Sequence, residues 1–207
     1  SPREEWRAGS EEIASISFLI IDIDYFKQVN DSLGHAAGDR VLRQMGMVLS
    51  SAVRESDTTI RWGGEEFLVI ARGPKENDSA VLAERIRKKI ALTPYAVNNG
   101  KNIRLTCSIG FASWPFFDFE PDALGWQEII ALADRCLYLA KNSGRNAWFG
   151  IAARPDYRGS AESAILNDLW EAEAEGIISV QTSADSEAQG QQYQASSLEA
   201  PQSRTVS

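Results

Sequence analysis

The amino-acid sequence predicts an α+β fold in which helices flank a mixed, mainly antiparallel sheet. Segments of strand and helix character alternate in the order β-α-α-β-β-α-β-β-α-β. Gly63-Gly64 and Val97-Asn98-Asn99-Gly100 each lie between two strand-like runs, which is typical of tight antiparallel hairpins. Two such hairpins exclude a doubly wound sheet in which all strands are parallel.

A central strand is predicted over Ile16–Asp24, because this unbroken apolar run ends in carboxylates and is typical of a strand buried on both faces. A short helix over Tyr25–Leu33 follows and stops at Gly34. The next helix is expected to begin at Asp39, a favoured N-cap residue, and to continue to about Arg54.

The remaining elements follow from apolar periodicity and from glycines. Gly63-Gly64 predicts a type I′ turn, since that turn needs positive φ at both central residues. Gly144 predicts a left-handed cap after the last helix of the folded body. Arg87, on the third helix, is placed mostly opposite the apolar face of that helix. The predicted segments are the strands Thr58–Trp62, Phe67–Ala71, Ile103–Ser113 and Asn146–Phe149 and the helices Asn77–Leu92 and Gln127–Asn142.

Composition divides the chain into four segments. Residues 1–15 are polar and charged and are interpreted as a linker or boundary segment, and residues 16–150 form the folded domain. Residues 179–207 are rich in Ser, Gln, Ala and Glu, which predicts a disordered acidic tail. Between them, residues 151–178 are interpreted as a helical extension, with a helix over Ala161–Glu175 built around Ile165, Leu166, Leu169 and Trp170.

The net charge of −8 lies mainly in the C-terminal part of the chain. Residues 1–150 carry 18 Lys and Arg against 20 Asp and Glu, whereas residues 151–207 carry 3 against 9. Neither part has the basic excess that binding of DNA or RNA requires. No apolar run reaches the length of a membrane span, so no membrane contact is expected from this segment. We expect a cytoplasmic location, either of the chain itself or as the cytoplasmic part of a larger, membrane-anchored protein.

Two pairs of carboxylates carry the main indication of function. Asp22 and Asp24 end the apolar first strand, and Glu65 and Glu66 open a strand that can pair beside it. Carboxylates from adjacent strand ends supply the hard oxygen ligands of a Mg²⁺ site that handles a nucleoside triphosphate. A solvated hairpin tip is the alternative interpretation of the two glutamates. Adjacent strand residues point to opposite faces, so the two are not equivalent ligands unless the turn twists them.

The segment Tyr25–Asn30 follows the first strand and enters a helix. Free backbone N–H groups at such a helix start form an anion site suited to phosphates, which makes Phe26 and Lys27 candidate substrate contacts. The Walker loop G-x-x-x-x-G-K-[ST] does not occur in the sequence, which excludes an ATPase of that type.

Several of these segments together resemble the GGDEF family of diguanylate cyclases, over about residues 16–149. The resemblance implies a palm-like fold, similar to that of nucleotidyl cyclases and some polymerases. It also implies condensation of two GTP molecules to cyclic di-GMP with release of pyrophosphate. The matching segments are Asp22–Asp31, Gly34–Asp39, Arg61–Phe67, Ser108–Gly110, Ala133-Asp134 and Lys141–Asn146.

The resemblance implies roles for the carboxylates. Asp22, the Ile23 carbonyl and Glu65 match the Mg²⁺ ligands of the family, with Mn²⁺ as a substitute. Glu65 also matches the proposed base for the ribose 3′-hydroxyl, and it stands where the family name has aspartate. Glu66 matches a residue that supports the second metal.

The resemblance also implies the substrate contacts. Asn30 and Asp39 match the guanine readers, and a carboxylate can accept hydrogen bonds from both N1–H and the exocyclic amine of guanine. His35 lies by the same pocket, where it either contacts the substrate or braces the turn before Asp39. Lys141 and Arg145 match the triphosphate contacts, although positive charge at a helix end also complements the helix dipole.

A separate inhibitory site is implied just before the first hairpin. Arg54-Glu55-Ser56-Asp57 matches the R-x-x-D site that binds the product cyclic di-GMP, and Arg85 matches its secondary contact. The alternative is a functionally silent i,i+3 ion pair between Arg54 and Asp57 at a helix end.

Because the product joins two GTP molecules, the active species implied is a homodimer whose sites face each other. The family's upstream stretch D-x-L-T-G-L-x-N-R-R does not occur here, which indicates a fragment of a longer protein. A non-catalytic signalling module that binds GTP or cyclic di-GMP is the alternative function.

Overall fold

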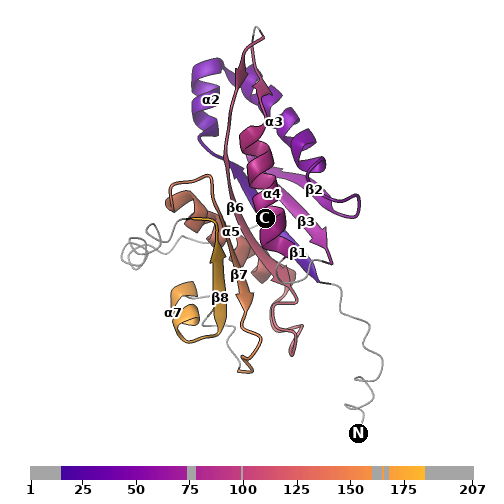
Figure 1. The fold of residues 1–207 in the computed structure, drawn as a ribbon, viewed down its shortest axis with the longest axis vertical. Coiled ribbons are helices and arrows are strands. Elements are labelled where there is room, and N and C mark those ends of the chain that lie inside the picture. The colour runs from indigo at the N-terminus through magenta and orange to yellow at the C-terminus, as the bar shows by residue number, and fades with distance from the viewer. Residues whose placement is uncertain (1–14, 74–77, 99, 160–164, 166–167, 185–207) are drawn as a thin grey trace.

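The computed structural model describes residues 15–73, 78–98, 100–159, 165 and 168–184 (Figure 1). Apart from Ser15, the predicted linker therefore lies outside the described residues, as does the predicted tail from residue 185 onward.

A six-stranded sheet organises the fold, with the strand order β2-β3-β1-β6-β7-β8. Neighbouring strands are antiparallel except β6 and β7, which are parallel. The predicted α+β fold with a mixed, mainly antiparallel sheet is therefore confirmed. The strands are β1 (Ile16–Ile23), β2 (Thr58–Gly63), β3 (Glu66–Arg72), β6 (Cys107–Trp114), β7 (Trp148–Ala153) and β8 (Ile178–Thr182).

Helices cover both faces of this sheet (Figure 1). Alternate residues of β1 point to opposite faces, so Leu19 and Ile21 pack in one core with α3 and α4, while Phe18 and Ile20 pack in another with α5. The first strand is thus buried on both faces, as predicted. The helices are α2 (Phe26–Leu33), α3 (His35–Ser50), α4 (Asp78–Leu92) and α5 (Trp126–Asn142).

Helix α5 approaches the sheet closely at Gly110 of β6. A Cβ at this position would collide with the carbonyl oxygen of Ala133 and the backbone nitrogen of Leu137. Only glycine permits this approach, and it brings the last turn of α5 next to the end of β1.

The second predicted hairpin is a separate two-stranded sheet of β4 (Tyr95–Ala96) and β5 (Asn102–Ile103). The prediction of one strand over Ile103–Ser113 is wrong, because Arg104–Thr106 separate β5 from β6. This connecting segment has other partners: the Arg104 guanidinium donates to the carbonyl of Leu92 at 3.1 Å, and the Thr106 carbonyl accepts from the backbone of Asp24 at 3.0 Å.

The predicted start and end of the second helix are both wrong. Helix α3 begins at His35, because Gly34, with φ 82°, ends α2 and starts α3 with no further connecting residue. Asp39 therefore lies inside the helix and does not cap it. At the other end α3 stops at Ser50, before Arg54.

The hairpin of β2 and β3 is confirmed, but its turn differs from the predicted type I′. The two residues between the strands are Gly64 and Glu65, and of these only Gly64 has a positive φ, of 42°. The pairing register shifts between Arg61 and Gly63, a bulge that moves the turn by one residue.

The C-terminal extension is part of the folded body. Strand β8 pairs antiparallel with β7, so the prediction of disorder is wrong for residues 179–184. Ile165 and Leu169 are buried in the same core as α5. The predicted helix is interrupted at Asp168, whose extended backbone caps helix α7 (Leu169–Ala174), and Leu166 lies outside the described residues.

In the part of the chain that the structure describes, no helix combines the length and apolar character that a membrane crossing demands.

Candidate active site

The carboxylates predicted to act together meet where β1 ends beside the β2–β3 turn. The register pairs Asp22 of β1 directly with Glu66 of β3, so these two side chains are neighbours on one face of the sheet. Glu65 lies in the turn itself. The two glutamates are therefore not equivalent, as the strand alternation predicted, yet both lie close enough to Asp22 for their charges to act on it.

Asp22 combines burial with strong charges of both signs. Burial is the main cause that raises the pKa of this carboxyl, and the negative charges of Glu65 and Glu66 add to the increase. The Lys141 ammonium opposes it from α5, because Nζ lies 2.8 Å from Asp22 Oδ2. The structure thus places Lys141, predicted as a triphosphate contact, against a predicted metal ligand.

The donor set at this edge fits a divalent metal ion. Asp22 is only 8% exposed and shares its site with other carboxylates, an accumulation of negative charge that a cation relieves. Within the described residues, no three His, Cys, Asp or Glu side chains form a preassembled metal cluster. The ligand set implied by the family resemblance needs only two carboxylates. It consists of Asp22, Glu65 and the Ile23 carbonyl, with the other coordination positions open to water and phosphate.

Asp24 is a structural residue. It is 2% exposed, and it accepts hydrogen bonds from the Thr106 hydroxyl at 2.6 Å, the Ser108 hydroxyl at 2.7 Å and the backbone N–H of Asn146 at 3.0 Å. Both carboxylate oxygens are thereby engaged by neutral donors. Asp24 fastens the end of β1 to β6 and to the loop after α5.

That loop presents Arg145 to the site in an uncommon backbone conformation. Gly144 is left-handed, with φ 106°, which confirms the predicted cap. Arg145 and Asn146 follow with φ 66° and 45°, a region that few non-glycine residues adopt. The Arg145 guanidinium lies over the ring of Tyr25, 4.6 Å from its centre, and so beside the start of α2.

At the start of α2, the backbone N–H groups and not the ring of Phe26 are available to a ligand. Phe26 is 6% exposed, and its ring packs beside Gly38 of α3. Lys27 is exposed.

The predicted guanine readers lie together. The side chain of Asn30 lies across the start of α3 at Gly38, where any Cβ would collide with Asn30 Oδ1. Asp39 is the next residue of α3 and is exposed. The His35 side chain is exposed and makes no hydrogen bond to any described residue, so it does not brace the turn by hydrogen bonding.

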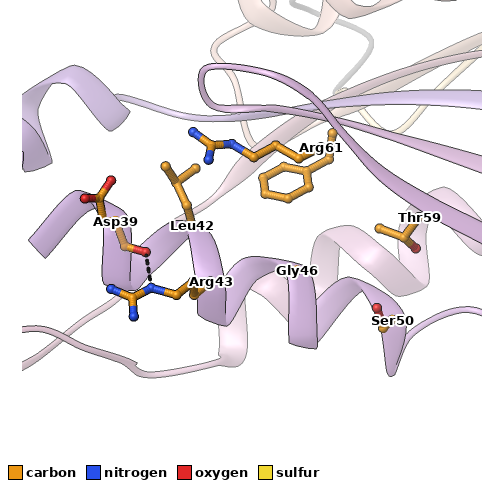
Figure 2. Close-up of a pocket in the computed structure, with 8 residues that line it drawn as sticks. Asp39, Leu42, Arg43, Gly46, Ser50, Thr59 and Arg61 are labelled. Carbon is orange, nitrogen blue, oxygen red and sulfur yellow. Dashed lines mark hydrogen bonds between the residues drawn. The ribbon is translucent and has the colours of Figure 1, made fainter. Parts of the chain in front are cut away.

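A groove of about 550 Å³ runs from Asp39 between α3 and the β2–β3 hairpin. Figure 2 shows the Arg61 side chain extending toward the end that holds Asp39, with Thr59 and Ser50 at the other end. Arg61 donates to the Gly64 carbonyl through Nε at 3.0 Å and Nη2 at 2.8 Å, which closes the hairpin turn that carries Glu65.

The predicted inhibitory residues lie on elements other than those of the acidic edge, Arg54 in the segment after α3 and Arg85 on α4. Arg54 and Arg85 are exposed, and neither guanidinium has a partner among the described residues. The alternative of a side-chain ion pair between Arg54 and Asp57 is wrong. The Asp57 carboxylate instead accepts from the backbone N–H groups of Arg54 at 2.9 Å and Arg72 at 3.2 Å.

Sequence reasoning missed the residues that support the site from behind. Ser108 and Asn146 lie in motif segments, and only their spacing was available as a signal. Arg87 had no signal: the helical pattern places it mostly on the exposed face, whereas its side chain is only 18% exposed.

The fold and the acidic edge together define a nucleotidyl cyclase-like domain. Residues 3–147 match the family described as "Diguanylate cyclase, GGDEF domain". The chain belongs to this family, which confirms the resemblance.

Curated relatives include the diguanylate cyclase DosC of Escherichia coli, 41% identical over 131 residues, which are 63% of this chain and 27% of the relative. The response regulator PleD of Caulobacter vibrioides is 42% identical over 139 residues, 67% of this chain and 30% of the relative. The chain thus spans less than a third of the length of these two relatives. Among solved structures, the GGDEF domain of DgcB from Caulobacter crescentus in complex with c-di-GMP has a TM-score of 0.58 at 28% identity, covering 70% of this chain and 80% of that one.

Proposed function

We propose that this chain is the catalytic domain of a diguanylate cyclase, which condenses two GTP molecules to cyclic di-GMP and releases pyrophosphate. The observation that carries the proposal is the acidic edge: Asp22 opposite Glu66, with Glu65 in the adjoining turn. The family match and the activity named for DosC support it.

Each part of the substrate has a candidate partner. The amide of Asn30 and the carboxylate of Asp39 read guanine, and Arg145 and Lys141 bind the triphosphate beside the start of α2. Lys141 already neutralises Asp22, so it can serve a carboxylate and a phosphate in the same site. Glu65 accepts the proton of the ribose 3′-hydroxyl.

Asp22, the Ile23 carbonyl and Glu65 would hold Mg²⁺ or Mn²⁺, and Glu66 would support a second ion. When bound, the metal supplies positive charge that stabilises the oxygens of the transferring phosphoryl group.

The Glu65→Gln variant tests the proposal, because it keeps the size of the side chain but removes its charge and its basicity. We expect cyclic di-GMP formation from GTP and Mg²⁺ to fall about 100-fold or more, with an unchanged thermal midpoint. Glu120→Gln, a change at another exposed acid, is the matched control. A rate above about a tenth of the wild type would reject the role of Glu65. A wild type that binds GTP or cyclic di-GMP without turnover would favour the non-catalytic module.

Catalysis by this mechanism requires a homodimer. Each domain presents one acidic edge, and the product needs two GTP molecules joined head to tail, so two edges must face each other. Specific activity should therefore rise with protein concentration across the micromolar range. A specific activity that stays constant over that range would contradict the requirement for association.

Product inhibition at Arg54 and Arg85 extends the proposal. Their guanidinium groups, which have no partner in the described part of the chain, can bind phosphate or a guanine edge of cyclic di-GMP, and Asp57 shapes the loop between them and the hairpin. Arg54→Ala should weaken cyclic di-GMP binding by about tenfold or more in calorimetry. Arg72→Ala, which keeps the backbone donor to Asp57, is the control. Equal affinity in Arg54→Ala and the wild type would show that Arg54 takes no part.

A further inference from the structure

A charged network behind the active site joins α4 to the loop that carries Arg145. We propose that Arg87 of α4 is a positioning residue for the triphosphate of the substrate: it holds Asn146 and thereby directs Arg145. The inference rests on the proposed function, because it names what orients one of the triphosphate contacts.

Arg87 is itself held in one orientation. Its Nε and Nη2 donate to the two carboxylate oxygens of Glu84, at 2.9 and 2.8 Å, which fixes the plane of the guanidinium. The remaining nitrogen, Nη1, faces Asn146 and donates to its side-chain oxygen at 2.8 Å and its carbonyl at 3.2 Å. The Arg87 side chain is only 18% exposed, although the Asn146 side of these contacts is open to solvent.

Glu84 is in turn fixed from two further sides. The indole Nε1 of Trp148 on β7 donates to Oε2 at 3.0 Å, and Lys88 Nζ lies 3.1 Å from Oε1. The hydrogen bond from Arg87 is the main cause that lowers the pKa of Glu84 to about 2, so the carboxylate stays ionised at neutral pH. The network therefore ties α4 to β7 as well as to the loop.

Asn146 is held from both sides. Its backbone N–H donates to the buried carboxylate of Asp24, while its carbonyl and side chain accept from Arg87. These contacts maintain the left-handed φ of 45°. Arg145 precedes Asn146 directly, so the orientation of the shared peptide sets the direction in which Arg145 leaves the loop, over Tyr25.

A network that only fastened α4 to the sheet would affect all ligands alike. The positioning role makes a narrower claim, because the guanine readers lie on α2 and α3, and among the described residues no hydrogen bond or ion pair joins them to Arg87, Glu84 or Asn146. Loss of Arg87 should therefore weaken binding of the triphosphate and leave recognition of guanine unchanged.

The experiment compares two nucleotides on the same protein. Calorimetry on the full chain with Mg²⁺ measures GMP and the α,β-methylene analogue of GTP, which cannot release pyrophosphate. We expect Arg87→Met to weaken the analogue by about tenfold or more and GMP by less than about twofold, with KM for GTP rising in parallel. Arg87→Lys, which keeps the charge but not the two-sided contact, should recover part of the loss.

Lys88→Met is the matched control, since it removes the other cation on Glu84 but no contact to Asn146. We expect it to change both affinities by less than about twofold. Asn146→Gly keeps the left-handed backbone and removes only the side-chain acceptor, so it tests the same link without a long side chain being lost. It should weaken the analogue selectively by about threefold.

Equal weakening of both nucleotides in Arg87→Met and Asn146→Gly, or no weakening of either, would overturn the positioning role. A failure of the proposed function looks different: the wild type itself would bind neither nucleotide, or would bind the GTP analogue and form no cyclic di-GMP from GTP.

Discussion

Asp22 and Asp24 lie at the same end of the first strand, yet their surroundings differ in kind. Asp24 accepts three hydrogen bonds from neutral donors, two hydroxyls and a backbone N–H. Asp22 faces a lysine and two glutamates, and its burial raises its pKa. The first arrangement stabilises a carboxylate within the fold. In the second, burial and two neighbouring glutamates disfavour the ionised carboxylate, and a cation relieves this.

The difference follows from the positions that the two residues occupy. Asp22 is still within the ladder, opposite Glu66 and Ser108, so its side chain projects on the α5 face toward Lys141. Asp24 lies beyond the ladder, where the chain leaves the sheet and the loop after α5 closes over it. Two positions along the chain therefore separate a carboxylate available for chemistry from a carboxylate that organises the site.

The largest expected effect comes from Asp22→Asn. Asparagine has the same size and removes a charge that burial disfavours, so the free energy of unfolding should change by less than about 1 kcal/mol. Turnover of GTP should fall about 100-fold or more, because the carboxylate proposed to bind the metal is lost. Cyclic di-GMP formation and urea unfolding on the same preparation check both parts. A variant that loses stability and activity together would remove the distinction from Asp24.

Asp24→Ala should give the opposite result. The hydroxyls of Thr106 and Ser108 and the backbone N–H of Asn146 would lose their acceptor inside the protein. We expect a loss of about 3 kcal/mol in the free energy of unfolding and a fall of about 10 °C in the thermal midpoint. Unchanged stability with lost turnover would instead place Asp24 in the chemistry, beside Asp22.

Ser108→Ala tests the Asp24 anchor with a smaller change. It removes one of the three donors and leaves the carboxylate and the other two in place. The free energy of unfolding should fall by about 1 kcal/mol, and GTP turnover should stay within about twofold of the wild type. Ser113→Ala, a serine on the same strand whose hydroxyl is far from the site, is the comparison. A larger loss of turnover than of stability would link Ser108 to catalysis directly.

The elements that could be predicted from the sequence are those whose signals lie within a few neighbouring residues. The first strand carries its burial in an unbroken apolar run, and α5 carries both its periodicity and its Gly144 cap. The start of α3 could not be predicted in this way, because the capping preference of Asp39 competes with Gly34, whose backbone already turns the chain into the helix. For β8 the alternation of Ile178 and Val180 was present, but the polar composition of the following residues outweighed it.

The same distinction between local signals and long-range contacts applies to the candidate site. Motif spacing located Asp22, Glu65 and Asp39, since each lies in a short segment with a recognisable order of residues. The ion pair of Lys141 with Asp22 and the contact of Arg87 with Asn146 join residues far apart in the sequence. Such pairs arise from the packing of α5 and α4 on the sheet, and no local pattern carries them.

The smallest expected effect is the pH dependence that Glu84 contributes to the network around Asn146. Hydrogen bonding by Arg87 lowers the pKa of Glu84 from its ordinary value of 4.5 to about 2 in the folded protein. Because the folded pKa is the lower one, the stabilisation is complete above pH 4.5 and is lost as the pH falls toward 2. Solvent reaches part of this side chain, which is 28% exposed, so the effect is modest. Urea unfolding of the wild type and Glu84→Gln between pH 3 and 7, about the range that covers the upper part of this titration, measures it. The gap in unfolding free energy should be widest near neutral pH and narrow below pH 4.5. A gap that stays constant with pH would mean that Glu84 holds Arg87 by hydrogen bonding alone, without a contribution from its charge.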